Sequence, residues 1–72
     1  DGPPPHEVLG VAADIGDDDL RRRWKALVRE NHPDKLIAEG LPEEFVAAAT
    51  ERLARINAAY DVMARARGLA GS

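Results

Sequence analysis

His32, Pro33, Asp34 and Lys35 are consecutive in this chain, and their side chains include the groups best suited to chemistry. An imidazole and a carboxylate in a stiff, proline-containing turn could work as a general acid and base, or could offer charged hydrogen-bonding groups to a partner protein. Acid–base catalysis is disfavoured because no nucleophile and no third orienting group lies nearby in sequence. Asp34 could also be only a turn or capping residue, but that role explains neither His32 nor Pro33. We therefore predict that this turn binds a partner and that the chain is not an enzyme.

Metal and cofactor chemistry has little support in the sequence. The chain has no cysteine, and its two histidines, His6 and His32, lie far apart. Thiolate ligands are therefore absent, and the usual ligand spacings of a zinc site are missing. We expect no cofactor and no metal, and we expect His6 to be a partly buried packing residue.

A run of basic residues precedes the turn. The net charge is −3, yet residues 20–29 carry five cations and no acid. This run could be an ordinary solvated helix face, or it could dock on an acidic partner, and the adjacent tripeptide favours docking. The negative net charge argues against a nucleic-acid partner, because counterion release needs a concentrated basic surface. The cations that we predict to bind the partner are Arg21, Arg22, Lys25 and Arg29.

Two helices must position this turn. Leu20, Trp24, Leu27 and Val28 recur at the spacing of one helix face, so we predict a helix over 17–31 that begins after Gly16. A residue before proline is pushed out of the helical region, so this helix should end near Asn31 and residues from His32 onward should form a loop.

The second helix follows Pro42, with two acids in its first turn. Its apolar residues recur at steps of four and three, and 46–67 contains no glycine or proline. At ~1.5 Å per residue this helix is roughly 37 Å long and the 17–31 helix roughly 22 Å, so the longer one should overhang its partner. The predicted core stripe comprises Phe45, Ala49, Leu53, Ile56, Tyr60 and Met63.

The remaining apolar residues favour a short helix that starts at Pro5 and is ended by Gly10. An all-α fold follows, in which an antiparallel helical hairpin is closed by this short N-terminal helix. We divide the chain into an extended linker over 1–5, one domain over 6–67 and a frayed end over 68–72. The start at Asp1 and the proline run favour a domain cut from a longer chain.

The sequence resembles a J-domain of the DnaJ family over nearly its whole length. The residues that carry the resemblance are Pro5-x-x-x-Leu9-Gly10-Val11, Leu20-x-x-x-Trp24-x-x-Leu27, His32-Pro33-Asp34-Lys35 and Ile56-Asn57-x-Ala59-Tyr60-x-Val62. A narrower likeness links Asp34-Lys35-Leu36-x-Ala38-x-Gly40-Leu41-Pro42, and a longer stretch between Asp34 and Leu53, to the J-domains of the DjlA-type, membrane-anchored bacterial members.

The resemblance implies a co-chaperone module that binds the ATP-bound state of a DnaK-type heat-shock chaperone and accelerates its ATP hydrolysis. The basic helix would dock on the chaperone, and Asp34 would make the coupling contact, with His32 and Pro33 fixing the turn. It also implies a monomeric domain on the cytoplasmic side that makes no membrane contact itself, while a segment absent here could anchor the parent chain to the inner membrane. Ala26 stands where many J-domains have a second basic residue, which puts the strength of docking in question.

Two other functions stay open at this point. A J-like interaction domain could keep the fold and bind a partner without stimulating its ATPase. A small helical DNA-binding module is the less favoured alternative, because the 34–40 stretch is too long for the usual helix-turn-helix corner.

Overall fold

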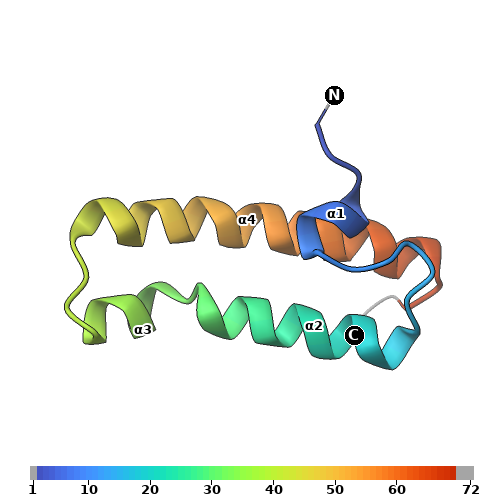
Figure 1. Ribbon diagram of the computed structural model, residues 1–72, viewed down its shortest axis with the longest axis horizontal. Coiled ribbons are helices and arrows are strands. Elements are labelled where there is room, and N and C mark those ends of the chain that lie inside the picture. Colours follow the sequence, from blue (N-terminus) through green and yellow to red (C-terminus); the bar gives the residue numbers. More distant parts are fainter. Residues whose placement is uncertain (1, 70–72) are drawn as a thin grey trace.

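Four α-helices make up the computed structural model, which describes residues 2–69. They are α1 (Pro5–Leu9), α2 (Asp17–Glu30), α3 (Pro33–Ala38) and α4 (Glu43–Ala66). The described residues contain no β-strand, so the prediction of an all-α fold is confirmed. Figure 1 shows α2 and α4 running antiparallel, with α1 lying across them near the C-terminal end of α4 and α3 below its beginning.

The predicted ends of α1 and α2 are confirmed. Pro5 occupies the first turn of α1, and Gly10 follows in the left-handed conformation, with a φ of 69°. A residue with a Cβ is strained in that conformation, which is why glycine suits the end of this helix. Gly16 precedes α2, and three aspartates fill its first turn, where the helix dipole favours negative charge.

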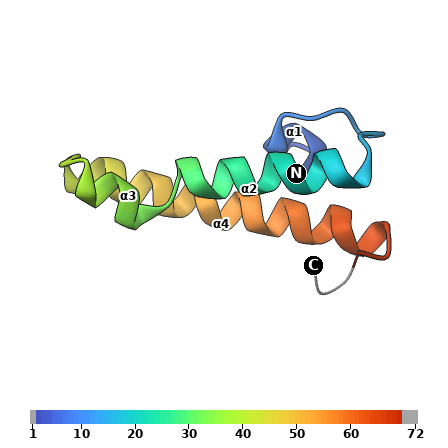
Figure 2. The same cartoon turned by 90° about the horizontal axis from the view of Figure 1, so that it is seen from below.

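The core lies where α1, α2 and α4 meet. Leu9, Leu20 and Ile56 are the largest fully buried side chains, one from each of these helices. Tyr60 and Met63 extend the same cluster along α4. Both ribbon views place α1 against the hairpin, which closes the core at that end (Figures 1 and 2). Leu27 lies at the edge of this cluster and is only partly buried.

The prediction of a loop from His32 onward is wrong for most of its length. Residues Pro33–Ala38 form α3, and only His32 keeps the extended conformation that a following proline imposes, with a ψ of 126°. Proline has no N–H to lose at the first position of a helix and its φ is already helical, so Pro33 starts α3. α3 packs against the part of α4 that extends beyond α2, so the overhang of the longer helix is covered.

The predicted core stripe of α4 is wrong at its first residue. Phe45 is 58% exposed, whereas Ala49, Ile56, Tyr60 and Met63 are buried and Leu53 is partly buried. The spacing of Phe45 is correct for the stripe, but α1 and α2 do not reach the first turn of α4, and only α3 lies alongside it (Figure 1).

The end of α4 is held in place as far as the structure describes it. The Leu69 N–H donates to the Ala64 carbonyl at 2.7 Å, and Leu69 packs against the core. Of the expected frayed end, residues 70–72 lie outside the described residues. Asp1 of the expected linker lies outside them as well.

Candidate partner-binding site

The His32-Pro33-Asp34 tripeptide forms the start of α3. The backbone N–H of Asp34 donates to His32 Nδ1 at 3.2 Å, so the imidazole caps the helix. This hydrogen bond uses the Nδ1 lone pair, and a doubly protonated imidazole could not accept it. The Asp34 carboxylate lies in the first turn with its side chain 89% exposed, and its Oδ2 is 4.0 Å from His32 Nδ1. The carboxylate is therefore open to a partner and is held by a local helix.

Asn31, the residue before the tripeptide, is held by two side-chain hydrogen bonds. It is 7% exposed, and its Nδ2 donates to the Leu27 carbonyl at 2.8 Å, which caps the last turn of α2. Its Oδ1 accepts from Arg52 Nη1 of α4 at 3.1 Å. Because both polar ends of Asn31 are satisfied, the end of α2 is tied to α4 immediately before His32. The angle at which the tripeptide leaves α2 is set by this contact.

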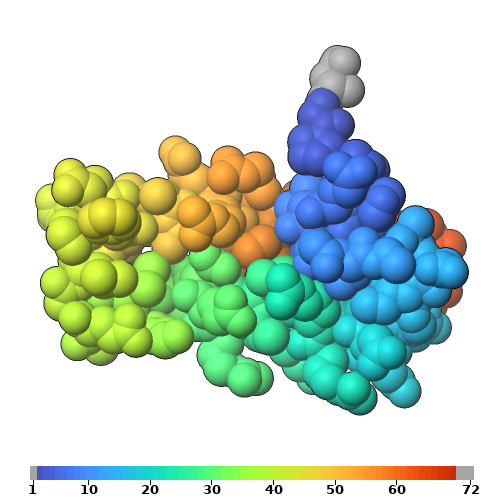
Figure 3. All heavy atoms as spheres, in the orientation of Figure 1, coloured from blue at the N-terminus to red at the C-terminus, as the bar shows by residue number. Residues whose placement is uncertain are grey.

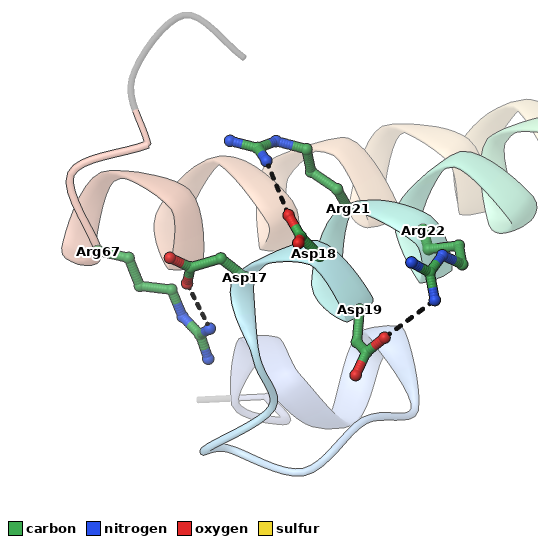
Figure 4. A network of polar contacts seen from close by, with 6 residues as sticks. All are labelled: Asp17, Asp18, Asp19, Arg21, Arg22 and Arg67. Carbon is green, nitrogen blue, oxygen red and sulfur yellow. Dashed lines mark hydrogen bonds and ion pairs between the residues drawn. The ribbon is translucent and has the colours of Figure 1, made fainter.

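Two of the predicted cations are paired within the first turns of α2 (Figure 4). Arg21 lies 3.6 Å from Asp18, and Arg22 lies 3.1 Å from Asp19. The Arg22–Asp19 pair is exposed on both sides, and such a pair contributes only about 0.3–0.5 kcal/mol, so an acidic partner could recruit Arg22 at little cost. The side chain of Arg21 is only 34% exposed and is the less accessible of the two.

Lys25 and Arg29 are the cations of α2 that have neither an ion pair nor a side-chain hydrogen bond with a described residue. Both are exposed. With His32 they border an open, mostly apolar groove of about 410 Å³ whose other lining residues are Trp24 and Val28. Lys35 is also exposed, one residue beyond Asp34. The structure thus brings a cationic rim, an apolar floor and His32 of the tripeptide together at the α2–α3 junction.

Trp24 is the rigid part of the groove. Its ring stacks on Tyr60 of α4 with centroids 4.2 Å apart and planes at 8°, and its Nε1 donates to Asn57 Oδ1 at 2.9 Å. The packing role expected for Trp24 and Tyr60 is confirmed. Since the indole cannot rotate without losing the hydrogen bond and the stacking, it offers a fixed apolar face beside Lys25.

Arg23 is part of the basic run in the sequence but does not line the groove beside Lys25 and Arg29. Its Nε donates to the Leu9 carbonyl at 3.0 Å, so the side chain is directed to the end of α1. Arg23 is one of the five cations of 20–29, and its charge alone does not reveal the direction of its side chain. The role of Asn31 was not predicted, although Asn31 continues the apolar spacing of α2 and a polar residue on that stripe indicates a buried contact.

Other chemistries receive no support from residues 2–69. Within that range, no three histidine, cysteine or acidic side chains lie close enough together to hold a metal ion. None of the helices described here combines the length and the apolar character that crossing a membrane requires.

Comparison with known proteins assigns the family. The DnaJ domain family matches residues 4–67. The chain is 41% identical over 63 residues to a protein named Co-chaperone protein DjlA of Pasteurella multocida, and 39% identical over 64 residues to the protein of the same name of Shewanella oneidensis. The matches cover 88% and 89% of this chain but only 22% and 24% of those proteins, so the chain spans about a quarter or less of their length. No solved structure gives a significant match. The fold, the tripeptide at the start of α3 and the match over residues 4–67 show that this chain belongs to the DnaJ domain family.

Proposed function

We propose that this domain binds the ATP-bound state of a DnaK-type heat-shock chaperone and stimulates its ATP hydrolysis. The observation that carries the proposal is the exposed Asp34 carboxylate at the start of α3, beside the groove rimmed by Lys25 and Arg29. The names of the DjlA relatives support it, because they are co-chaperones. The ATP chemistry would belong to the partner, and the domain would act as a monomer on the cytoplasmic side.

The two parts of the surface would divide the work. Exposed cations attract an acidic partner over a distance of about 8 Å at physiological ionic strength, so they raise the rate of encounter more than the final affinity. Asp34 is one carboxylate at a fixed position, which suits a charge-assisted hydrogen bond to a partner's arginine or backbone N–H. We therefore assign docking to α2 and coupling to Asp34.

The groove beside Lys25 and Arg29 could bind the chaperone even though position 26 is alanine and not a basic residue. Lys25 and Arg29 are one helical turn apart, and Trp24 and Val28 supply apolar contact between them. A partner that places an acidic side chain at the rim and an apolar one on the floor would gain from both. Docking would then depend less on a second basic residue at position 26.

Substitution of Arg29 tests the docking role. In Arg29→Ala the domain concentration that gives half-maximal ATPase stimulation should rise roughly fivefold, the equivalent of about 1 kcal/mol, with little change in the maximal rate. Arg65→Ala is the matched control, because Arg65 is an exposed arginine of α4 that pairs with Asp61 at 3.0 Å. Equal effects of the two substitutions would contradict the assignment of docking to α2.

The alternative functions give different results in the same assay. A J-like interaction domain would bind the chaperone without changing its ATPase rate. A DNA-binding module would leave the chaperone unaffected and would bind duplex DNA with a steep dependence on salt.

A further inference from the structure

The end of the molecule formed by α3 and the first turns of α4 exposes large apolar side chains. Ile37 is 61% exposed, Leu41 is 41% exposed and Phe45 is 58% exposed. Val62, on another part of α4, is the only other large apolar residue exposed to this degree in the described range. Three of four such residues thus belong to one short stretch of 37–45, which the proposed chaperone contact does not use. We call these three residues the tip patch.

Two residues of the tip patch, Ile37 and Leu41, line an open groove. Its volume is about 660 Å³, and it is lined by Ile37, Leu41, Glu43, Val46 and Ala47. Figure 3 shows this yellow-green end of the molecule as a broad face to which α3 and the start of α4 both contribute. Exposed apolar residues that share a groove, as Ile37 and Leu41 do, mark interaction sites more often than isolated apolar residues do.

The backbone holds the tip patch in a defined shape. The Leu41 N–H donates to the Leu36 carbonyl at 3.1 Å, and the Gly40 N–H donates to the Ile37 carbonyl at 3.0 Å. Gly40 has a φ of 78°, so α3 ends in the Schellman arrangement that requires a left-handed residue. A surface fixed in this way loses little conformational entropy when a partner binds it.

The rim of the tip patch is acidic. Glu39, Glu43 and Glu44 are exposed and make no ion pair with a described residue, and Lys35 is the only cation in 35–46. Acids in the first turn of α4 also stabilise the helix dipole, which accounts for Glu43 and Glu44 but not for the exposure of Ile37 and Phe45. The negative charge of these glutamates therefore favours a binding partner that carries positive charge beside its apolar residues.

We propose that the tip patch binds a basic amphipathic helix or strand of another protein, whose apolar side chains enter the groove while its lysines or arginines meet the glutamates. A second copy of this chain fits poorly, because a two-fold contact through the tip patch would bring acidic rims together. An anionic lipid surface is excluded by the same repulsion. A basic apolar segment is the occupant that matches both the charge and the exposed area.

The first test maps binding on the wild-type chain. The probe is a synthetic helical peptide of alternating leucine and lysine blocks, compared with a leucine–glutamate peptide of the same pattern. Titration of the ¹⁵N-labelled domain should shift the amide signals of 36–47 with the basic peptide and leave them unchanged with the acidic one. Shifts confined to α2, or equal shifts with both peptides, would overturn the proposal.

The second test uses substitutions on the exposed surface. Ile37→Ser should weaken binding of the basic peptide roughly tenfold, the equivalent of about 1.4 kcal/mol, because Ile37 lines the groove, and Val62→Ser should leave it unchanged. Both variants should keep the circular dichroism spectrum of the wild type, since both side chains are exposed.

Three outcomes would overturn the proposal. They are unchanged peptide binding by Ile37→Ser, self-association of the wild type that Ile37→Ser abolishes, and binding to anionic vesicles that depends on Ile37. A loss of chaperone stimulation in Ile37→Ser would also contradict it, because the tip patch would then be part of the chaperone contact. Failure of chaperone stimulation by the wild type would leave the peptide result unaffected, so the two proposals are tested separately.

Discussion

At the scale of single residues, the exposure of Asp34 depends on its neighbours. His32 accepts the Asp34 N–H and so satisfies one of the first donors of α3, while Pro33 has no N–H to satisfy. His32, Pro33 and Asp34 thus form the start of a helix. The Asp34 carboxylate does not take part in the cap and stays exposed to solvent. The sequence indicated the importance of the tripeptide, but it did not show that the histidine acts through its ring nitrogen.

Asn31→Ala tests whether the residue before the tripeptide is structural. The substitution would leave the Arg52 contact and the last carbonyl of α2 without their partner, so the free energy of unfolding should fall by about 1–3 kcal/mol. Asn57→Ala is the matched control, because its hydrogen bond to Trp24 is exposed and should be worth about 0.5–1.5 kcal/mol. Urea unfolding followed by circular dichroism measures both. A smaller loss for Asn31→Ala than for Asn57→Ala would contradict the role given to Asn31.

At the scale of elements, the sequence predicted three helices nearly to the residue, because their apolar spacing and their end signals agree. The sequence did not predict α3, although Pro33 begins it in the way that Pro5 begins α1. The rule that a residue before proline leaves the helix was applied to the whole 32–40 segment, whereas it limits His32 alone. Six residues also give too short an apolar pattern to indicate a helix by periodicity.

Arg67 shows what no local pattern could predict. Its guanidinium donates to the Ile15 and Ala13 carbonyls and pairs with Asp17 at 3.0 Å, so the end of α4 is tied to the connection between α1 and α2 (Figure 4). These contacts cross about fifty residues of chain. They join elements whose arrangement must be known before the contact can be seen.

Arg67→Ala should therefore destabilise the fold more than an ordinary surface substitution. Removal of the side chain leaves two carbonyls and Asp17 without their charged donor, and hydrogen bonds to charged groups contribute about 1.5–3 kcal/mol each where they are shielded from water. Arg65→Ala removes an exposed pair and should cost no more than about 0.5 kcal/mol. Thermal unfolding of the two variants compares them. Equal melting temperatures would show that the Arg67 contacts do not hold the connection.

At the scale of the whole molecule, the core is small and unevenly distributed. The fully buried side chains lie where α1 crosses the hairpin. At the other end of the molecule, α3 has no buried residue. The sequence predicted the hairpin and its closing helix because the apolar stripes have few surfaces to bury against. It could not predict that Phe45 remains outside, since that depends on how far α1 and α2 extend along α4.

Leu20 and Leu27 of α2 differ in burial, and the difference allows the uneven distribution of the core to be tested. Leu20→Ala should cost about 2–5 kcal/mol, because Leu20 has no exposed surface and its loss leaves a cavity. Leu27→Ala makes the same chemical change at a partly buried position and should cost clearly less. In a domain of this size the first loss could be most of the stability. Urea unfolding gives both values, and a larger cost for Leu27→Ala would contradict the core described here.

Single-turnover ATP hydrolysis by the DnaK-type chaperone of the same organism is the most direct test of the central claim, that Asp34 couples binding to hydrolysis. The domain would be added as wild type, as Asp34→Asn and as Asp14→Asn, which changes an exposed aspartate of the α1–α2 connection. Wild type and Asp14→Asn should stimulate hydrolysis equally, and Asp34→Asn, with unchanged helical content, should not. Stimulation by Asp34→Asn at the wild-type rate would contradict the central claim.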